Sequence, residues 1–573
     1  MEIKLNDKYK LESGIRFLTG SQALVRLPIV QIRKDNRNNI NTACYISGYR
    51  GSPLGGYDQQ ILKNIDYLKN QNIHFQPGIN EELAATSLWG TQQSNLRGEG
   101  KFDGVFGIWY GKGPGVDRAG DALKHVNLAG TSKYGGVLAL MGDDHICESS
   151  TTSHQSEFAM IDAMIPFFNP GGVQEILDYG SYGIHLSRQS GCWIGIKCVH
   201  DNVSSGATVD LDENRLFIKD VSNEFYPEDG LNIRLNDTPQ AKEHRLHYHK
   251  IKFVKEFCKV NELNQIIYDS SNAKVGIVST GKSYLDTKFA LEKIGIDENL
   301  AKEIGIKLLK IAMPWPLEDN IIHKFSAGLE KIIVVEEKRS LIETQIKEIL
   351  FNTNRNIKVV GKLDEDNEDL FISSGALDPG EIAIKLYKNI KKYYPSDKIK
   401  KKVDVLDNLI QQNRNLLNVK RIPYFCSGCP HNTSTKIPEN TRAITGISCA
   451  YLVQHMERNN EGFTQMGAEG ASWVGESVFS NTDHVFQNMG DGTYIHSGIL
   501  SIRHAVAAKT KMTFKILYND AVALTGGQAL DGLPTVAQMS RQLEAEGVKE
   551  IAIVTDEPDK YNSNENFSKN SKV

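Results

Sequence analysis

The chain has 573 residues, of which 40% are hydrophobic and 24% charged, and its formal net charge is −4. So small a net charge argues against a nucleic-acid-binding protein, which would carry a basic surface. The first residues are charged throughout and no run of 18 apolar residues occurs, so the sequence predicts neither a secretory signal nor a membrane span. Eight cysteines are too few for a disulfide framework in so long a chain, which favours a cytoplasmic protein.

The first part of the chain has the pattern of an α/β domain. From about residue 40 to 215, the short apolar runs TACYISGY, GVLALMGDD and CWIGIKCV alternate with helix-like segments. This alternation is typical of a parallel sheet wrapped by helices. Residues 216–270 are charged and poor in apolar residues, and we interpret them as a connector that contains a basic helix.

Two further α/β units follow. The second spans residues 271–360, and a segment rich in Lys, Asp and Asn, residues 361–420, is interpreted as another connector. The third unit, 421–573, has strand signals at HVFQNMGDG and TFKILYND, and its polar tail is predicted to be disordered.

The third unit contains a candidate magnesium site. One predicted strand ends at Gly490-Asp491-Gly492 and the next ends at Asn519. Because parallel strands bring their carboxyl ends to one edge of the sheet, Asp491 and Asn519 are expected to lie side by side. Two oxygen ligands of this kind suit Mg²⁺ held together with a substrate's phosphates, and the glycines allow a diphosphate to approach the backbone.

The same unit contains three cysteines within about two dozen residues: Cys426, Cys429 and Cys449. Three thiolates suit a metal centre, although a closed tetrahedral site requires four ligands. The other five cysteines lie in apolar or helical stretches and are interpreted as core thiols.

These motifs resemble those of a known family. The GDG-to-Asn arrangement is similar to the thiamine diphosphate motif, and TGGQ after it is similar to the 2-oxoacid:ferredoxin oxidoreductases. SGYRGSPLGGYD, WYGKGPGVDR, CSGCPHNTS and GDGTYIHSG resemble the indolepyruvate ferredoxin oxidoreductases, particularly the long fused type. The resemblance runs from about residue 15 to 558.

The resemblance implies an α/β fold in which two thiamine-diphosphate-binding, doubly wound parallel-sheet domains flank a transketolase-C-like domain. Residues 1–215 would be the pyrimidine-binding domain, 271–360 the transketolase-C-like domain and 421–573 the diphosphate-binding domain.

The resemblance also implies roles for single residues. Asp491 and Asn519 match the Mg²⁺ ligands, and Ala521 matches the position that supplies a backbone carbonyl. Glu81 matches the glutamate that bonds to N1′ of the cofactor and promotes its deprotonation at C2; its neighbour Glu82 is the alternative.

Further residues are implied for the substrate. Ser52 matches a threonine that contacts the substrate carboxylate, and Arg50 could clamp that carboxylate bidentately; a plain Gly/Pro turn is the competing interpretation. His145 and His154 lie in a polar segment, 142–157, that aligns near the family's active site. Each is either an acid–base group or a surface histidine.

The three cysteines match three ligands of a [4Fe-4S] cluster, with a zinc site as the competitor. Relatives supply the fourth cysteine downstream, where this chain has none, and fused relatives continue into a γ-type domain. Either the chain is an N-terminal fragment or split half, or its cluster is incomplete. We expect the first, with a γ-type domain or subunit required and oligomers formed.

The implied reaction converts a 2-oxo acid, such as an arylpyruvate, with coenzyme A and oxidised ferredoxin into acyl-CoA, CO₂ and reduced ferredoxin. Two alternatives remain open from the sequence. One is a non-oxidative thiamine diphosphate-dependent decarboxylase, and the other is a catalytically incomplete chain that acts only as a binding subunit.

Overall fold

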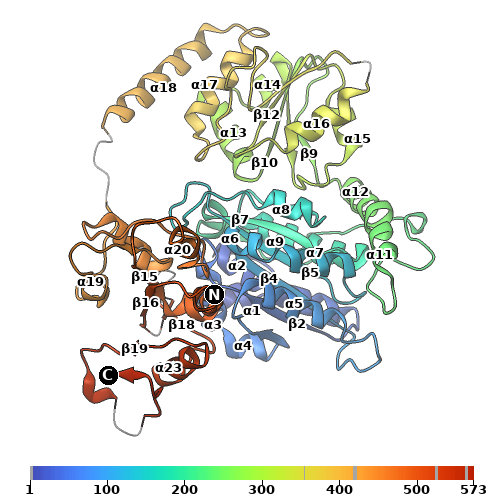
Figure 1. Ribbon diagram of the computed structural model, residues 1–573. Helices are drawn as coiled ribbons and strands as arrows, with labels where there is room; N and C mark the ends of the chain where they lie inside the picture. Colours follow the sequence, from blue (N-terminus) through green and yellow to red (C-terminus); the bar gives the residue numbers. More distant parts are fainter. Residues whose placement is uncertain are drawn as a thin grey trace. The chain divides into compact units, whose positions relative to one another are not determined.

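The computed structural model describes residues 4–353, 355–416, 422–519, 521–522, 527–561 and 565–572. It divides into two compact units, Met1–Asn418 and Val419–Val573. Figure 1 colours them from blue to yellow-orange and from orange to red. None of the helices in the described part of the chain combines the length and apolarity that a bilayer crossing requires.

The first unit begins with a six-stranded parallel sheet of order β3-β2-β4-β5-β7-β6. Its strands are β2 (Thr42–Gly48), β3 (Ile73–Phe75), β4 (Gly104–Lys112), β5 (Val137–Asp143), β6 (Phe167–Phe168) and β7 (Ile194–Val199).

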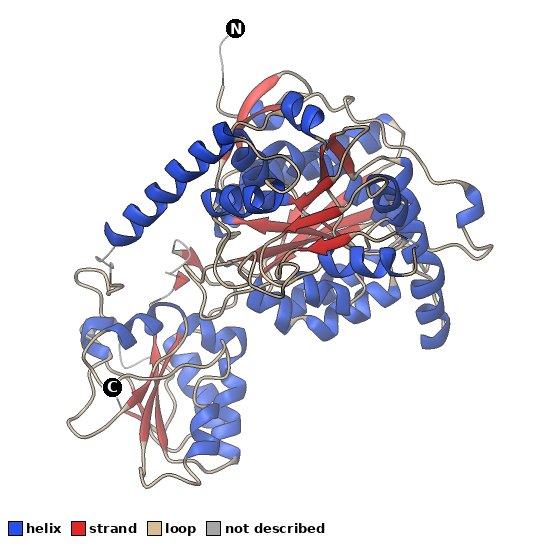
Figure 2. Ribbon diagram, turned by 90° about the horizontal axis from the view of Figure 1, so that it is seen from above, coloured by secondary structure: helices blue, strands red, loops and turns tan. Residues whose placement is uncertain are grey.

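Helices cover both faces of this sheet. In β5, Leu138 and Leu140 pack with α2 (Gly20–Arg37) and α9 (Val173–Ser190), whereas Ala139 and Met141 pack with α5 (Glu81–Gln92) and α7 (Gly120–Ala129). Figure 2 shows the helices around the strands. Because successive residues of a strand point to opposite faces, a strand buried on both sides is apolar throughout. The predicted doubly wound α/β fold is confirmed here.

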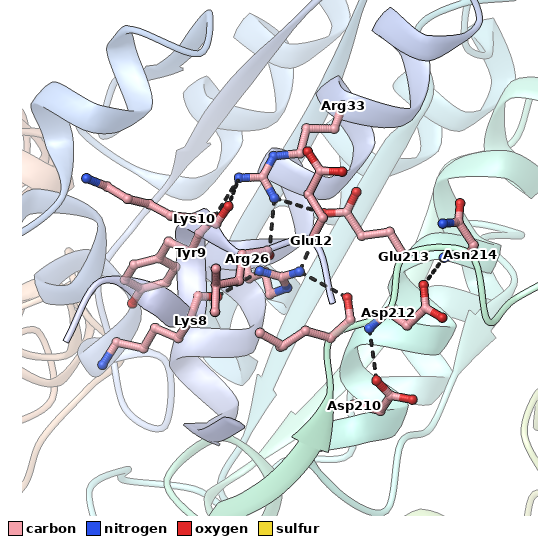
Figure 3. Close-up of polar contacts among 12 residues, drawn as sticks. Lys8, Tyr9, Lys10, Glu12, Arg26, Arg33, Asp210, Asp212, Glu213 and Asn214 are labelled. Atoms are coloured by element: carbon pink, nitrogen blue, oxygen red, sulfur yellow. Dashed lines mark hydrogen bonds and ion pairs between the residues drawn. The ribbon is translucent and has the colours of Figure 1, made fainter. Parts of the chain in front are cut away.

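A buried ion cluster ties α2 to an antiparallel pair of strands, β1 (Ile15–Thr19) and β8 (Gly206–Asp210). Glu213, just after β8, accepts from Arg26 at 3.4 Å and from Arg33 at 2.9 Å. Arg26 also donates to the carbonyl oxygen of Lys8 at 2.9 Å (Figure 3). Its side chain is only 1% exposed, so its charge depends on these partners.

The second sheet of this unit has the order β13-β12-β10-β11-β9, with only β9 antiparallel. Its strands are β9 (Gln265–Tyr268), β10 (Val275–Thr280), β11 (Ile306–Ile311), β12 (Lys331–Val335) and β13 (Lys358–Val360). The helices α13 (Gly281–Ile294), α14 (Glu298–Ile304) and α17 (Pro379–Ile390) pack on one face, and α15 (Asp319–Phe325) and α16 (Ile342–Phe351) on the other.

Both segments interpreted as connectors contribute to cores, and this differs from the sequence interpretation. Within 361–420, α17 and α18 (Asp397–Leu416) bury Ile382, Leu386 and Ile399 in the core of the second sheet. Within 216–270, α11 (Pro239–Arg245) and α12 (Ile251–Val260) follow one another, and α12 buries Phe253 and Phe257 in the core of the first sheet. An amphipathic helix needs few apolar residues, so its charged face dominates the composition.

The second unit contains a three-stranded parallel sheet, β14-β15-β16. The strands are β14 (Ala443–Ile444), β15 (Val485–Gly490) and β16 (Met512–Leu517), and the main helices are α20 (Ala471–Glu476), α22 (Ile499–Ala507) and α23 (Val536–Ala545). The tail is predicted to be disordered, but it contains β20 (Ser571–Lys572). The backbone of β20 forms a parallel ladder with β19 (Ile551–Ala552).

Candidate active site

Asp491 and Asn519 lie side by side at the carboxyl edge of the second unit's sheet. In the register of the parallel pair, Gly490 at the end of β15 lies opposite Leu517 at the end of β16. Asp491 follows Gly490 and is 3% exposed. Its Oδ2 accepts from the backbone N–H of Asn519, and its Oδ1 accepts from that of Gly492, both at 2.8 Å. The expected juxtaposition is therefore present.

The surroundings of this pair fit a magnesium-bound diphosphate. The side-chain oxygen of Asn519 accepts from the backbone N–H of Ala521 at 3.2 Å, which brings the third residue of the predicted ligand set to the same place. A Cβ added at Gly490 would meet nothing within 4 Å, so the space beside the backbone is open. Thr525 and Gly526 of the TGGQ motif lie outside the described residues. Mg²⁺ bound to carboxylate and amide oxygens, with phosphate completing its shell, suits this donor set.

Glu81 and Glu82 occupy different environments in the first unit. Both begin α5, where the side chain of Asn80 caps the helix by accepting from the backbone N–H of Leu83 at 3.0 Å. Glu81 is 6% exposed, and the indole N–H of Trp109 donates to its carbonyl oxygen at 3.0 Å. The side chain of Glu82 is 43% exposed and pairs with Arg118 at 3.8 Å. Burial therefore favours Glu81 as the functional carboxylate.

The turn 113–118, which forms the short helix α6 after β4, lies against the Glu81 carboxylate. A Cβ on Gly115 would lie 2.3 Å from Glu81 Oε1, so only glycine allows this approach. This is the GKGPGVD part of the WYGKGPGVDR motif, which includes α6 (Gly113–Arg118). The motif thus shapes the site of the carboxylate.

Arg50 is held within the fold. Its side chain is 6% exposed, and its Nε lies 3.4 Å from Oδ2 of Asp58, whose side chain is 1% exposed. The guanidinium therefore already neutralises a buried carboxylate, and a substrate carboxylate would have to share it. Ser52 lies two residues further along the same turn and is partly buried.

The segment 142–157 places His154 against the turn 113–118, which contacts Glu81, whereas His145 lies away from that turn. His154 Nε2 lies 3.1 Å from Asp117 Oδ2, and His154 Nδ1 lies 3.0 Å from the carbonyl oxygen of Thr152. Burial, reinforced by the nearby Lys197, Lys338 and Lys282, lowers the pKa of His145 to about 2. His145 is thus neutral and a poor proton donor near neutral pH.

The three cysteines of the second unit are neighbours. Cys426 is exposed, and Cys429 and Cys449 are partly buried. Burial raises the pKa of the Cys449 thiol, and the adjacent Cys429 and Cys426 raise it further. Among the described residues, no group of three or more His, Cys, Asp or Glu side chains is arranged to hold a metal ion. Thiolates are the ligand type of iron–sulfur clusters, but these three are not arranged as a metal-binding group in this structure.

Sequence reasoning did not single out three buried acidic residues. Asp143 and Glu157 both pair with Lys197, whose side chain is 3% exposed, across the end of the first sheet. Glu469 is fully buried, and burial raises its pKa to about 7. It accepts from the backbone N–H of Gly467 at 2.7 Å, and near 3.4 Å from that of Ile447, two residues before Cys449. Asp143 and Glu157 lie at the two ends of the segment 142–157, but nothing in the local sequence indicates that both pair with the distant Lys197. Glu469 is an isolated acidic residue between elements and gives no pattern.

Family models for an oxidoreductase domain and for a thiamine diphosphate-binding domain match one part of each unit. Residues 446–556 match the model of the C-terminal TPP-binding domain of thiamine pyrophosphate enzymes, and residues 265–413 match that of the indolepyruvate oxidoreductase domain. The second match begins at β9 and ends within α18, so it includes the helices that we interpreted as a connector.

Curated relatives extend the similarity over most of the chain, as homologues named indolepyruvate oxidoreductase subunit IorA. The subunit of Methanothermobacter marburgensis is 23% identical over 96% of this chain and 82% of its own length. That of Pyrococcus horikoshii is 24% identical over 90% of this chain and 76% of its own. These relatives confirm the resemblance to the indolepyruvate oxidoreductases. Among solved structures, the 2-oxoglutarate:ferredoxin oxidoreductase of Magnetococcus marinus is 13% identical, with a TM-score of 0.48 over 66% of this chain and 65% of that one.

Proposed function

We propose that the chain is the thiamine-binding subunit of an enzyme that oxidatively decarboxylates a 2-oxo acid, of the indolepyruvate or arylpyruvate type. The products would be acyl-CoA and CO₂, with electrons passing through an iron–sulfur cluster to ferredoxin. A second subunit of the γ type would complete the enzyme, in keeping with relatives that are named as subunits. The observation that carries the proposal is the buried Asp491 beside Asn519 at the ends of two parallel strands.

In this proposal the chain's residues bind, orient and move protons. Asp491, Asn519 and the carbonyl group of Ala521 hold Mg²⁺ and through it the diphosphate. The Glu81 carboxyl group holds a proton at N1′ of the pyrimidine, while Gly115 lets it lie against the turn. Thiamine diphosphate supplies the electron sink for loss of CO₂. Arg50 and Ser52 orient the substrate carboxylate, and Cys426, Cys429 and Cys449 hold the cluster.

An anaerobic assay of the chain with its γ-type partner tests the proposal. Indolepyruvate, coenzyme A and oxidised ferredoxin are supplied, and acyl-CoA and reduced ferredoxin are measured. Two electrons transferred to ferredoxin for each acyl-CoA formed are expected, with loss of both products in Asp491→Ala. Aldehyde formation without ferredoxin reduction would instead indicate the non-oxidative decarboxylase. Absence of any product, with thiamine diphosphate bound, would indicate a binding subunit only.

A further inference from the structure

The second sheet of the first unit holds the segment 142–157 of the first sheet. Lys338, just after β12, donates through its side-chain ammonium to the backbone carbonyl oxygen of His145. Beside it, the backbone N–H of Arg339 donates to the side-chain oxygen of Gln155 at 3.1 Å, and Gln155 donates back to the carbonyl oxygen of Arg339 at 3.2 Å. Both ends of the loop therefore contact one short stretch of chain.

Lys338 is an unusual residue for such a contact. It is 6% exposed although it carries an ammonium group, and its φ is +58°, in the left-handed region that favours glycine. Residues held in such conformations cost free energy and persist where the surrounding structure requires them. In this strained backbone conformation, the ammonium group of Lys338 reaches the carbonyl oxygen of His145.

Within the first sheet, the far end of the segment is fixed separately. Asp143, at the end of β5, accepts from the backbone N–H of Ser156 at 3.0 Å, and Lys197 of β7 pairs with Glu157. A polar cavity lies between these residues and the second sheet, where Lys282 and Glu336 line it. The near end is also held within the first sheet, where Lys112 of β4 donates to the carbonyl oxygen of Ser149 and Asp144 accepts from the backbone N–H of Ser149 at 2.9 Å. Lys338 adds the contact from the second sheet at His145.

From this segment, contacts continue to Glu81. The ring of His154 lies against the turn after β4, because a Cβ on Gly113 would come within 2.4 Å of its Cγ. His154 also pairs with Asp117 of the same turn at 3.1 Å. The turn 113–118 also contacts the Glu81 carboxylate, through Gly115.

We propose that Lys338 is a positioning residue of the candidate active site. Together with Arg339, which bonds Gln155 next to His154, it ties the segment 142–157 to the second sheet and keeps His154 on the turn 113–118. The turn keeps the Glu81 carboxylate in place. The second sheet then has a role in the site although none of its residues touches Glu81. The effect of this contact on catalysis rests on the proposed function. The link that it makes between the second sheet and the turn 113–118 does not.

Amide hydrogen exchange of the cofactor-free protein tests the coupling directly. Lys338→Met removes the ammonium group, and Lys338→Gly removes it while relieving the left-handed backbone, so the two variants separate contact from strain. Loss of a hydrogen bond from a charged group should speed exchange by about 10-fold or more in 142–157 and also in 113–118. Asn367→Gly, which relieves a left-handed residue (φ +63°) on the exposed surface of the same sheet domain, is the matched control and should change neither segment.

Faster exchange in 142–157 with an unchanged turn 113–118, in both Lys338 variants, would overturn the proposal. A second readout is the holoenzyme with its partner. Both variants should lower kcat for the 2-oxo acid several-fold while the Kd of thiamine diphosphate stays near the wild-type value. If the wild-type enzyme turns over no 2-oxo acid, the proposed function fails, and the exchange experiment still decides the coupling.

Discussion

The two units hold their principal carboxylates by different means. In the second unit, Asp491 accepts backbone N–H groups at the ends of two adjacent parallel strands, so strand register alone places it beside Asn519. In the first unit, Glu81 is placed by packing: an indole N–H bonds its carbonyl oxygen, and a glycine turn admits its side chain. The register of β15 and β16 depends on one short βαβ connection. The packing around Glu81 depends on several segments that are distant in sequence. The first site should therefore be more sensitive to changes far from it.

The largest expected effect is on the chemistry of the first unit. Glu81→Gln should lower kcat of the holoenzyme by about 10²–10⁴-fold, because general acid–base groups typically contribute that much. Thiamine diphosphate should still bind, as measured by calorimetry, since the isosteric amide preserves packing. Glu82→Gln is the matched control and should have little effect, because that side chain is 43% exposed. A larger effect of Glu82→Gln would transfer the role to the neighbour.

A distant substitution tests the dependence of the first unit on packing. Glu213→Ala removes the partner of Arg26 and Arg33 (Figure 3). Removing this carboxylate from the buried Arg26 and the partly buried Arg33 should lower the free energy of unfolding by about 3–5 kcal/mol, measured by urea denaturation. Glu12, whose side chain is 64% exposed, pairs with Arg37, and Glu12→Ala should lower the free energy of unfolding by about 1 kcal/mol or less. Equal losses of unfolding free energy in the two variants would contradict the expectation that the buried ion pairs contribute more than the exposed one.

In the second unit, the effect should be local and fall on binding. Asp491→Ala should weaken Mg²⁺-dependent binding of thiamine diphosphate by about 10–100-fold, if an interaction with a charged group contributes roughly 1.5–3 kcal/mol. Isothermal titration calorimetry with and without Mg²⁺ measures it. Asp483→Ala, an exposed aspartate just before β15, should bind as the wild type does. Wild-type affinity in Asp491→Ala would remove it from the site.

The smallest expected effect is a pH dependence. Burial raises the pKa of Glu336 to about 7, although backbone N–H groups of Leu341, Ile342 and Glu343 oppose the shift. Because the folded protein holds this proton more tightly than the unfolded chain, the contribution is present at low pH and is lost as pH rises from about 4.5 to 7.

Over that range Tm of the wild type should fall by a few degrees more than Tm of Glu336→Gln, measured by differential scanning calorimetry. The amide of glutamine keeps an acceptor for the helix N–H groups, so the variant should remain folded. Parallel Tm curves for the two proteins would show that Glu336 does not titrate in this range.

Local patterns in the sequence predicted part of the fold and part of the candidate site. The apolar runs predicted parallel sheets, and the positions of GDG and Asn519 at two strand ends predicted their juxtaposition, because neighbouring parallel strands share an edge. The motif resemblance was confirmed by the curated relatives. Only the tertiary structure decided that Glu81 is buried and its neighbour Glu82 exposed, since that depends on which distant segments cover each side chain. It also decided that the charged connectors pack as helices and that Lys338, 193 residues from His145, contacts that residue, because such contacts arise only when separate elements meet.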